Sequence, residues 1–422
     1  MTIFWKGLIA VHDVKNIFQV GVPVSKENMI GYKNYLNDLF DLVSVKNNIS
    51  IVGVRKTGKT SIVQAIAKQY EEIYSRSGAC IQINLGLCDS FDDFCKILVE
   101  NLIEIIEDRH TLNTISIQSK LIELQNNCKY DDIKSMRIIT FLFHFLTSHI
   151  GCYIIIDEFD TAANIFEPRH YQFIRGLSDT AKARLITVSR RPIYIVEKKK
   201  DPTNSLFHGI MKSFYIAGFD EENIVEYYNV LENVYGIILS DEQKRKLHYY
   251  AGSSPYIYSM FGQQFFLQKR NNDRVDVDMA IRKCNPELDD YKKSIYQILL
   301  TDYIKREDGL EEVCTAEKLM SVVYGPTLNL TKDDIIKLKE QGYLYSYERN
   351  GKEYYGALSE DFTEFLGQQG YSSDSWKLIL SVERNCKLMV RRAMQRRIGQ
   401  EEITFITPVT IKHNIFFQQA LM

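Results

Sequence analysis

Residues 49–60 read ISIVGVRKTGKT, and this stretch decides the fold. Its apolar beginning is typical of a short strand, Gly53 opens a loop, and residues 61–74 continue with the apolar spacing of an amphipathic helix. A GxxxxGK sequence followed by Ser or Thr, between a strand and a helix, is a phosphate-binding loop, because glycines let several backbone N–H groups converge on a triphosphate. A chance glycine turn before a helix is the competing interpretation.

The polar residues of this loop have separate expected tasks. Lys59 is expected to reach the β and γ oxygens of ATP, and the Thr60 hydroxyl to ligate Mg²⁺. The positive end of the helix that follows attracts the phosphates. The candidate nucleotide-binding residues of the stretch are Gly53, Lys56, Thr57, Gly58, Lys59, Thr60 and Ser61.

A second motif supplies acids about a hundred residues later. Residues 153–158 read YIIIDE, an apolar strand-like run that ends in two carboxylates. In a P-loop ATPase one acid holds Mg²⁺ and a neighbouring acid orients or deprotonates the attacking water. We therefore expect Asp157 on the metal and Glu158 as the general base, whereas Asp160 receives no catalytic role. The alternative is a buried strand with polar residues at its end.

A further strand at residues 185–188 ends in Ser189, Arg190 and Arg191, after a helix that carries Arg175. Strands that alternate with helices predict an α/β core with a mostly parallel sheet and helices on both faces, and ligands bind beyond the carboxyl ends of such strands. Ser189 is expected to sense the γ-phosphate, and Arg190 or Arg191 to neutralise its charge. Arg175 is the candidate for reaching a neighbouring subunit's nucleotide. A solvated arginine pair at a strand end is the alternative.

The whole chain has the composition of a soluble globular protein. It has 422 residues, a formal charge of −2, and 45% hydrophobic and 25% charged residues, which is enough for two or three domains. No apolar run reaches the ~20 residues of a membrane span, and the first residues lack a signal-peptide pattern, so we expect a cytoplasmic protein that does not contact a membrane. The eight cysteines form no CxxC pair, which gives no zinc spacing and fits a reducing compartment.

Six segments together resemble one family, the archaeal-type ATPases of the STAND branch of P-loop NTPases, which are relatives of the AAA+ ATPases. The segments are VGVPVSKENMIGY, GVRKTGKT, YIIIDEFD, TVSRRPIY, FYIAGFDEENIVEYY and YYAGSSPYIY. The resemblance covers about residues 18–366 and implies an ATPase core, a small helical lid and a winged-helix domain. The implied division is a leader bordering the nucleotide at 1–48, the core at 49–215, the lid at 216–288, the winged-helix domain at 289–368, and a basic amphipathic helix with a tail at 369–422. Tyr32 departs from the pattern, because relatives often carry arginine after the glycine.

The resemblance also implies contacts with the nucleotide base. Gly252 and Pro255 match the GxxP-type turn of the lid, which approaches the base in relatives. Pro23, Val24 and Ile30 fall where the leader borders the adenine. The base is therefore expected between the leader and the lid.

The remaining segments carry weaker signals. Residues 110–130 are polar and aperiodic and predict a loop or a frayed helix, whereas Asn350 and Gly351 predict a hairpin, because a type I′ turn needs positive φ at both positions. The third helix of the implied winged-helix domain, residues 331–342, balances three lysines against three acids, which favours docking to protein over DNA contact. Residues 375–399 predict an amphipathic helix with arginines in its last turns, for which nucleic-acid contact, through DNA or RNA, partner docking and packing on the preceding domain all stay open.

These features together predict an ATP-binding and ATP-hydrolysing switch that couples its nucleotide state to a protein partner or effector. We expect the hydrolysis to be slow or stimulated by the partner, and the ATP-loaded form to assemble as a homo-oligomer. Family analogy points to prokaryotic signalling or anti-phage defence. Two other functions stay open, namely an initiator or regulator whose DNA affinity is set by ATP, and a nucleotide-binding scaffold without turnover.

Overall fold

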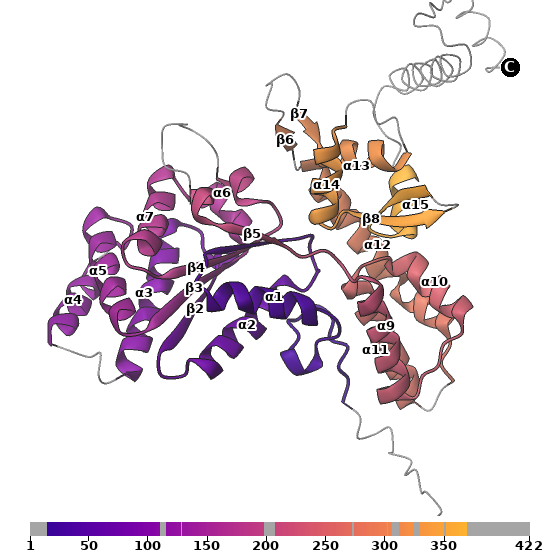
Figure 1. Cartoon of the computed structure of the whole chain (residues 1–422), viewed down its shortest axis with the longest axis horizontal. Coiled ribbons are helices and arrows are strands. Elements are labelled where there is room, and N and C mark those ends of the chain that lie inside the picture. The colour runs from indigo at the N-terminus through magenta and orange to yellow at the C-terminus, as the bar shows by residue number, and fades with distance from the viewer. Residues whose placement is uncertain are drawn as a thin grey trace, which may run out of the picture.

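The centre of the molecule is a five-stranded parallel sheet with the strand order β2-β3-β4-β1-β5 (Figure 1). The computed structural model describes residues 15–109, 115–127, 129–197, 207–271, 274–301, 303–305, 312–324, 330–349 and 352–368. The strands are β1 (Ile49–Val52), β2 (Gly78–Asn84), β3 (Gly151–Asp157), β4 (Arg184–Ser189) and β5 (Lys212–Tyr215). A parallel sheet needs crossover connections, which explains why helices separate its strands along the chain.

Helices cover both faces of this sheet, as Figure 1 shows. The alternation of side chains along β3 divides them, because Tyr153 and Ile155 join one apolar core while Ile154 and Ile156 join the other. On the first face lie α1 (Lys33–Ser44) and α2 (Lys59–Ile73), and on the second lie α3 (Phe91–Asp108), α5 (Ile133–His149) and α7 (Pro168–Asp179). Burial on both sides accounts for the continuous apolar run of β3.

Short elements and one further helix complete this part of the chain. They are η2 (Lys26–Asn28), η3 (Leu85–Leu87), η4 (Phe159–Thr161), α6 (Ala162–Ile165), α8 (Ile193–Val196), η5 (Phe207–Ile210) and α4 (Ile115–Gln125). Helix α4 is more regular than the loop or frayed helix predicted for residues 110–130. Ile117, Leu121 and Leu124 are buried at helical spacing, and α4 packs on α5, so tertiary contacts stabilise a helix that the local sequence left undecided.

The strand register aligns the ends that matter for chemistry. Strand β4 lies between β1 and β3, and Val52 at the end of β1 is the register partner of Ser189 at the end of β4. Asp157 ends β3 on the other side of β4. The phosphate-binding loop, Ser189 and Asp157 therefore emerge at the same edge of the sheet.

Four helices follow the sheet: α9 (Glu221–Tyr235), α10 (Asp241–Ala251), α11 (Pro255–Arg270) and α12 (Val277–Thr301). Their starts are set by local chemistry, since the side chains of Asp220, Ser240 and Ser254 each accept a hydrogen bond from a backbone N–H in the first turn. Gly236 ends α9 in the left-handed conformation with φ of 61°. None of the helices in the described ranges is both long and apolar enough to cross a bilayer.

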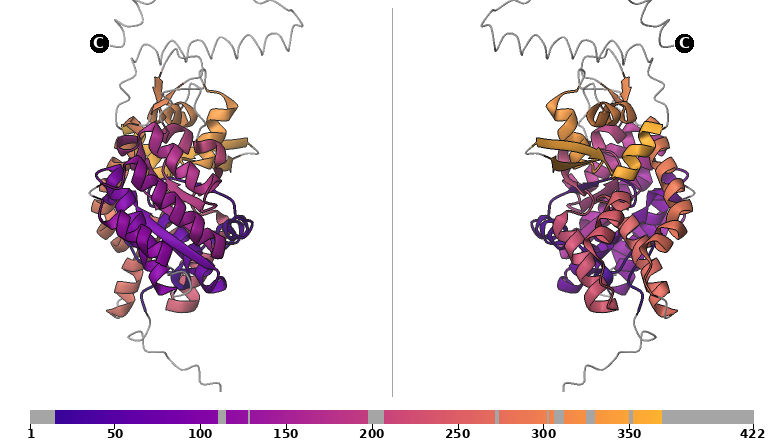
Figure 2. Two further views of the ribbon diagram at one scale, coloured as in Figure 1. Left: turned by 90° about the vertical axis from the view of Figure 1, so that its left-hand side faces the viewer. Right: turned by 90° about the vertical axis from the view of Figure 1, so that its right-hand side faces the viewer.

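The last described elements are β6 (Tyr303–Lys305), β7 (Glu312–Cys314), α13 (Thr315–Tyr324), α14 (Lys332–Glu340), β8 (Leu344–Arg349), β9 (Lys352–Ala357) and α15 (Glu360–Gln368). Strands β8 and β9 form the predicted hairpin, with Arg349 paired to Lys352, and the two turn residues lie outside the described ranges. In Figures 1 and 2 the elements from α13 onward, orange to yellow, lie beyond one end of the helices α9 to α12.

The five-part division of the chain stays a prediction. Helix α12 runs without a break across the boundary expected between residues 288 and 289, so the lid and the next part share one helix. The basic helix and tail expected after residue 368 lie outside the described residues.

Candidate functional site

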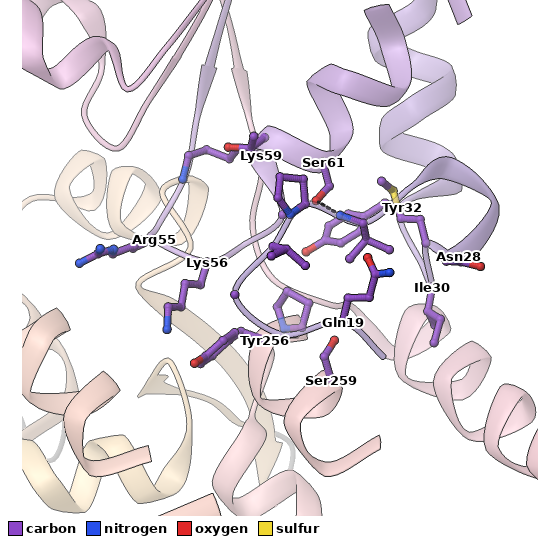
Figure 3. A pocket seen from close by; sticks show the side chains of 18 of the residues that line it. Gln19, Asn28, Ile30, Tyr32, Arg55, Lys56, Lys59, Ser61, Tyr256 and Ser259 are labelled. Atoms are coloured by element: carbon purple, nitrogen blue, oxygen red, sulfur yellow. Dashed lines mark hydrogen bonds between the residues drawn. The ribbon is translucent and has the colours of Figure 1, made fainter. Parts of the chain in front are cut away.

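A cavity of about 590 Å³ opens at the carboxyl ends of β1, β3 and β4 (Figure 3). The leader, the phosphate-binding loop and the ends of β3 and β4 form its walls together with α11. Its lining includes Pro23, Val24, Ile30, Lys56, Gly58, Lys59, Thr60, Ser61, Asp157, Glu158, Ser189, Arg190 and Pro255 from the residues expected at the site. A volume of this size is within the usual ~300–1,000 Å³ of small-molecule sites.

Two glycines shape the phosphate-binding loop for different reasons. A Cβ added to Gly53 would lie 2.4 Å from the Ile216 carbonyl oxygen, so only glycine lets the loop leave the sheet beside β5. Gly58 has φ of 82°, which favours glycine where the loop enters α2. Thr57 does not line the cavity, but its hydroxyl donates to the Val54 carbonyl oxygen at 2.9 Å and braces the loop from within.

Lys59 is held by its own loop. Its ammonium donates to the carbonyl oxygens of Gly53 at 2.9 Å and Val54 at 2.8 Å. Withdrawal of this ammonium from water lowers the pKa of Lys59 to about 8, and the nearby carboxylates, Glu158 first, oppose that shift. A phosphate, whose oxygens carry negative charge, is therefore a better partner for the Lys59 ammonium than these two neutral carbonyl oxygens.

The acids at the end of β3 adjoin the loop. The Thr60 hydroxyl donates to Asp157 Oδ2 at 2.8 Å, and the other Asp157 oxygen accepts from the Glu158 backbone N–H at 2.7 Å. A hydroxyl and a carboxylate at this separation fit Mg²⁺, which takes one or two protein oxygens and completes its shell with phosphate and water. No group of three or more His, Cys, Asp or Glu side chains suited to a metal occurs among the described residues, so an ion here needs the phosphates as further ligands.

The two candidate arginines after β4 have different surroundings. Arg190 lines the cavity, whereas Arg191 is not among its lining residues. The Ser189 hydroxyl donates to the Arg191 carbonyl oxygen at 2.7 Å, so it braces the turn from the edge of the cavity. Arg191 Nε donates to Asp160 Oδ1 at 2.9 Å, and the Arg190 N–H donates to Asp160 Oδ2 at 2.6 Å.

Arg175 lies away from this constellation. It belongs to α7, pairs with Asp179 at 3.0 Å one turn later, and is not among the lining residues. Its expected approach to a neighbouring subunit's nucleotide stays a prediction.

The leader joins the site to the helices that follow the sheet. The Val24 N–H donates to Ser61 Oγ at 2.9 Å, which ties the leader to the first turn of α2. Phe18 is 1% exposed and fills a notch over Gly262 of α11, where an added Cβ would lie 2.4 Å from the ring. Figure 3 shows Gln19 rising from the leader and Ser259 pointing from α11 toward it. The leader and α11 therefore border the same end of the cavity, and contact of this end with the nucleotide base stays a prediction.

The turn before α11 contributes only part of what was expected. Pro255 lines the cavity, but Gly252 does not. Gly252 has φ of 49°, and an added Cβ would lie 2.1 Å from the Leu358 carbonyl oxygen, so this glycine serves a close approach to the β9–α15 turn. Tyr256, which the sequence did not single out, lies under the Lys56 ammonium at 3.6 Å from its ring centroid.

Two further residues escaped prediction, and each acts over a long sequence separation. The buried Tyr32 hydroxyl donates to the Thr57 carbonyl oxygen at 2.7 Å, so the residue that departs from the family pattern anchors the loop. Asp160, which received no role, contacts both arginines after β4. Only the structure shows that Asp160 is buried, and a buried acid requires such partners.

Three of the six non-glycine residues with positive φ in the described part of the chain line the same cavity. Tyr32, Lys56 and Glu158 have φ of 64°, 65° and 52°, and all three line it. Side chains other than glycine rarely adopt this conformation, and where they do the surroundings must hold them there. The geometry of the general-base candidate is thus imposed by its neighbours.

No protein-family model matches this chain, and no curated protein matches it. Among solved structures it is similar to a Walker-type ATPase of Pyrococcus abyssi, with 14% identity, 83% of this chain and 99% of that chain covered, and a TM-score of 0.48. It is also similar to the Aeropyrum pernix Orc1 protein in complex with DNA, with 10% identity, 81% and 93% covered, and a TM-score of 0.40. AMPPCP-bound DnaA from Aquifex aeolicus shows 14% identity, 74% and 86% covered, and a TM-score of 0.36.

These likenesses are weak, and the class of protein is defined by this chain's own sheet and loop. A parallel sheet whose first strand runs through GVRKTGKT into a helix, with helices on both faces and further helices after it, is the fold of a P-loop NTPase. The predicted α/β core and the helices after it are therefore confirmed, whereas the winged-helix domain stays a prediction. The AAA+-related resemblance and membership of the STAND branch stay predictions.

Proposed function

We propose that this protein is an ATP-driven molecular switch that hydrolyses ATP slowly and passes its nucleotide state to a protein partner. One observation carries the proposal. A phosphate-binding lysine, a hydroxyl–carboxylate pair for Mg²⁺, an exposed glutamate and an arginine all border one cavity, and its far wall belongs to the leader and α11. A nucleotide in this cavity therefore contacts the phosphate-binding loop on one wall and the leader with α11 on the other, which are different parts of the chain.

Binding exchanges contacts within the loop for contacts to phosphate. Lys59 gives up two carbonyl partners and takes charged oxygens, which make stronger hydrogen bonds. Thr60 and Asp157 would hold Mg²⁺, which supplies charge neutralisation between the β- and γ-phosphates. Glu158 is exposed and lines the cavity, where it is placed to take a proton from an attacking water.

The contacts around Lys56 support transmission beyond the site. Its ammonium lies 3.6 Å from the Tyr256 ring centroid on α11 and 5.5 Å from that of Tyr291 on α12. The Tyr291 hydroxyl donates to the Arg55 carbonyl oxygen at 3.4 Å. A shift of the phosphate-binding loop therefore acts directly on α12, the helix that leads to the last described elements.

The geometry of α14 supports a protein-facing role over the DNA-binding alternative. Lys337 pairs with Asp333 at 2.6 Å, and Lys339 lies 5.1 Å from the Tyr355 ring centroid. A Cβ added to Gly342, just after α14, would lie 3.3 Å from Ala217 and 3.5 Å from Val54, so this end of the helix faces the ATPase core. Lysines engaged in this way offer little to a phosphate backbone.

The biological setting of the switch follows from the family resemblance, which supports prokaryotic signalling or anti-phage defence and assembly of the ATP-loaded form. Inspection of the neighbouring genes tests it. A nuclease or toxin gene beside this one is the expected result, whereas a replication origin would favour the initiator.

Turnover separates the switch from a scaffold. Glu158→Gln keeps the size of the side chain but cannot accept a proton, so ATP should still bind while hydrolysis falls by ~10²-fold or more. Glu100→Gln on the exposed side of α3 is the matched control and should leave both unchanged. Asp157→Asn should instead weaken binding that depends on Mg²⁺. Absence of hydrolysis in the wild type, even with its partner present, would favour the scaffold.

Arginine variants test whether the site is completed within one chain. Arg190→Ala should slow hydrolysis by the same factor at every protein concentration. If Arg175 acts on a neighbouring subunit, Arg175→Ala should regain activity in mixtures with Glu158→Gln, since each variant supplies what the other lacks. Wild-type rates in both alanine variants would contradict this account of hydrolysis.

A further inference from the structure

The buried acid Asp160 sits between the catalytic edge of β3 and the arginines after β4. It is 5% exposed and belongs to η4, the short turn that begins directly after Glu158. A buried carboxylate is costly unless charged or hydrogen-bonding groups surround it. Here the partners come from a segment about thirty residues further along the chain.

The two oxygens of this carboxylate take different partners. Oδ2 accepts the Arg190 backbone N–H at 2.6 Å and lies 3.6 Å from Arg190 Nε. Oδ1 accepts Arg191 Nε at 2.9 Å. One acid therefore fixes the backbone of Arg190 and the side chain of Arg191 at the same time.

The contacts of Asp160 leave part of the Arg190 guanidinium facing the cavity. Arg190 lines it, and its charge lies close enough to Lys59 to act on that ammonium. Among the described residues, Arg190 contacts Asp160 through its backbone N–H and through its Nε. The outer nitrogens of the Arg190 guanidinium are therefore available to an anion in the cavity, whereas the Arg191 side chain donates to Asp160.

The turn that carries Asp160 also carries the general-base candidate. The Thr161 N–H donates to the Glu158 carbonyl oxygen at 3.0 Å, and Phe159 is fully buried between the two acids. Glu158 and Asp160 are thus parts of one rigid turn. Any displacement of that turn moves the general-base candidate and the arginine together.

We propose that Asp160 is a positioning residue that presents Arg190 to the γ-phosphate and holds Arg191 away from it. The inference rests on the proposed binding of ATP at this cavity. Asp160 itself touches no nucleotide. Its effect runs entirely through Arg190, so the protein distinguishes ATP from ADP in cis through an acid three residues after Asp157.

The test compares single and double variants of the full chain. Calorimetry with Mg²⁺ measures the dissociation constants of ADP and of a non-hydrolysable ATP analogue, and the ratio of the two constants is the result. This readout requires no turnover. The wild type should prefer the triphosphate, and Arg190→Ala and Asp160→Asn should each reduce the preference about tenfold or more, the scale of a lost charged hydrogen bond. Arg191→Ala is the matched control and should keep the preference. Asp160→Asn added to Arg190→Ala should cause no further loss.

Several results would overturn the inference. An equal loss from Asp160→Asn in the wild type and in Arg190→Ala would mean that Asp160 does not act through Arg190. Loss of the preference in Arg191→Ala with retention in Arg190→Ala would reverse the roles of the arginines. If Asp160→Asn does not fold, Asp160→Glu, whose longer side chain displaces the Arg190 backbone, takes its place in the same comparison. A wild type that binds neither nucleotide would refute the proposed function and this inference with it, whereas binding without a change in the ratio refutes the inference only.

Discussion

Replacing Tyr32 by Phe removes one buried hydroxyl and leaves the ring in place. That hydroxyl donates to the Thr57 carbonyl oxygen at 2.7 Å, and only 4% of Tyr32 is exposed. Thr57 itself is 6% exposed, so its carbonyl loses this partner in the protein interior, which costs ~1–3 kcal/mol. We expect the free energy of unfolding to fall by that amount.

Tyr227 provides the matched control. It is 1% exposed, and its buried hydroxyl makes no hydrogen bond to any described residue. Tyr227→Phe therefore removes a polar atom that is already unpaired, and the free energy of unfolding should stay the same or rise slightly.

Denaturant unfolding followed by circular dichroism measures both variants against the wild type, and calorimetry measures ATP binding. Because Thr57 belongs to the phosphate-binding loop, a loss of about 1 kcal/mol in loop stability should lower ATP affinity roughly fivefold in Tyr32→Phe. Tyr227 also borders the cavity, but its hydroxyl is buried and unpaired among the described residues, so Tyr227→Phe should keep the ATP affinity of the wild type. Equal destabilisation by the two substitutions would refute the reasoning, since the hydrogen bond is the feature that distinguishes them.

Three other predictions concern the charge, the backbone and the leader. The pKa of Lys59 is lowered to about 8, and ATP prefers the protonated form of this side chain. ATP affinity should therefore fall as the pH rises above that value, by up to tenfold per pH unit, and calorimetry in two buffers should detect proton uptake on binding. An ATP affinity that stays constant from pH 7 to 9 would contradict this prediction. Gly53→Ala should lower the free energy of unfolding by ~1–3 kcal/mol and abolish tight ATP binding, because the new Cβ meets the Ile216 carbonyl oxygen at 2.4 Å. In Gly176→Ala in α7, the control, the new Cβ meets nothing within 4 Å, so thermal melts should show a neutral or stabilising effect. Phe18→Ala should cost ~3–5 kcal/mol, and an unchanged melting temperature would show that the leader is not held by its ring.

The sequence by itself determined the elements whose chemistry is local. The run from Ile49 to Thr60 predicts a strand, a glycine loop and a helix start, because the apolar spacing and the glycine positions that define them lie within a few residues. The apolar strand before Asp157 and the hairpin of β8 and β9 were predictable for the same reason, since a short apolar run and turn chemistry act over a few positions. The parallel sheet followed from the order of these local signals.

Contacts between distant residues were decided only by the tertiary structure. Whether Arg190 or Arg191 faces the cavity depends on which oxygen of Asp160 each one meets, across about thirty residues. The Tyr32 hydroxyl reaches Thr57 because α1 and α2 pack on the same face of the sheet. Neither partner carries a local signal of the other, since hydrogen bonds over such separations are set by how the layers pack. The sequence thus named the groups that do chemistry, and only the folded chain specified which of them the cavity brings together.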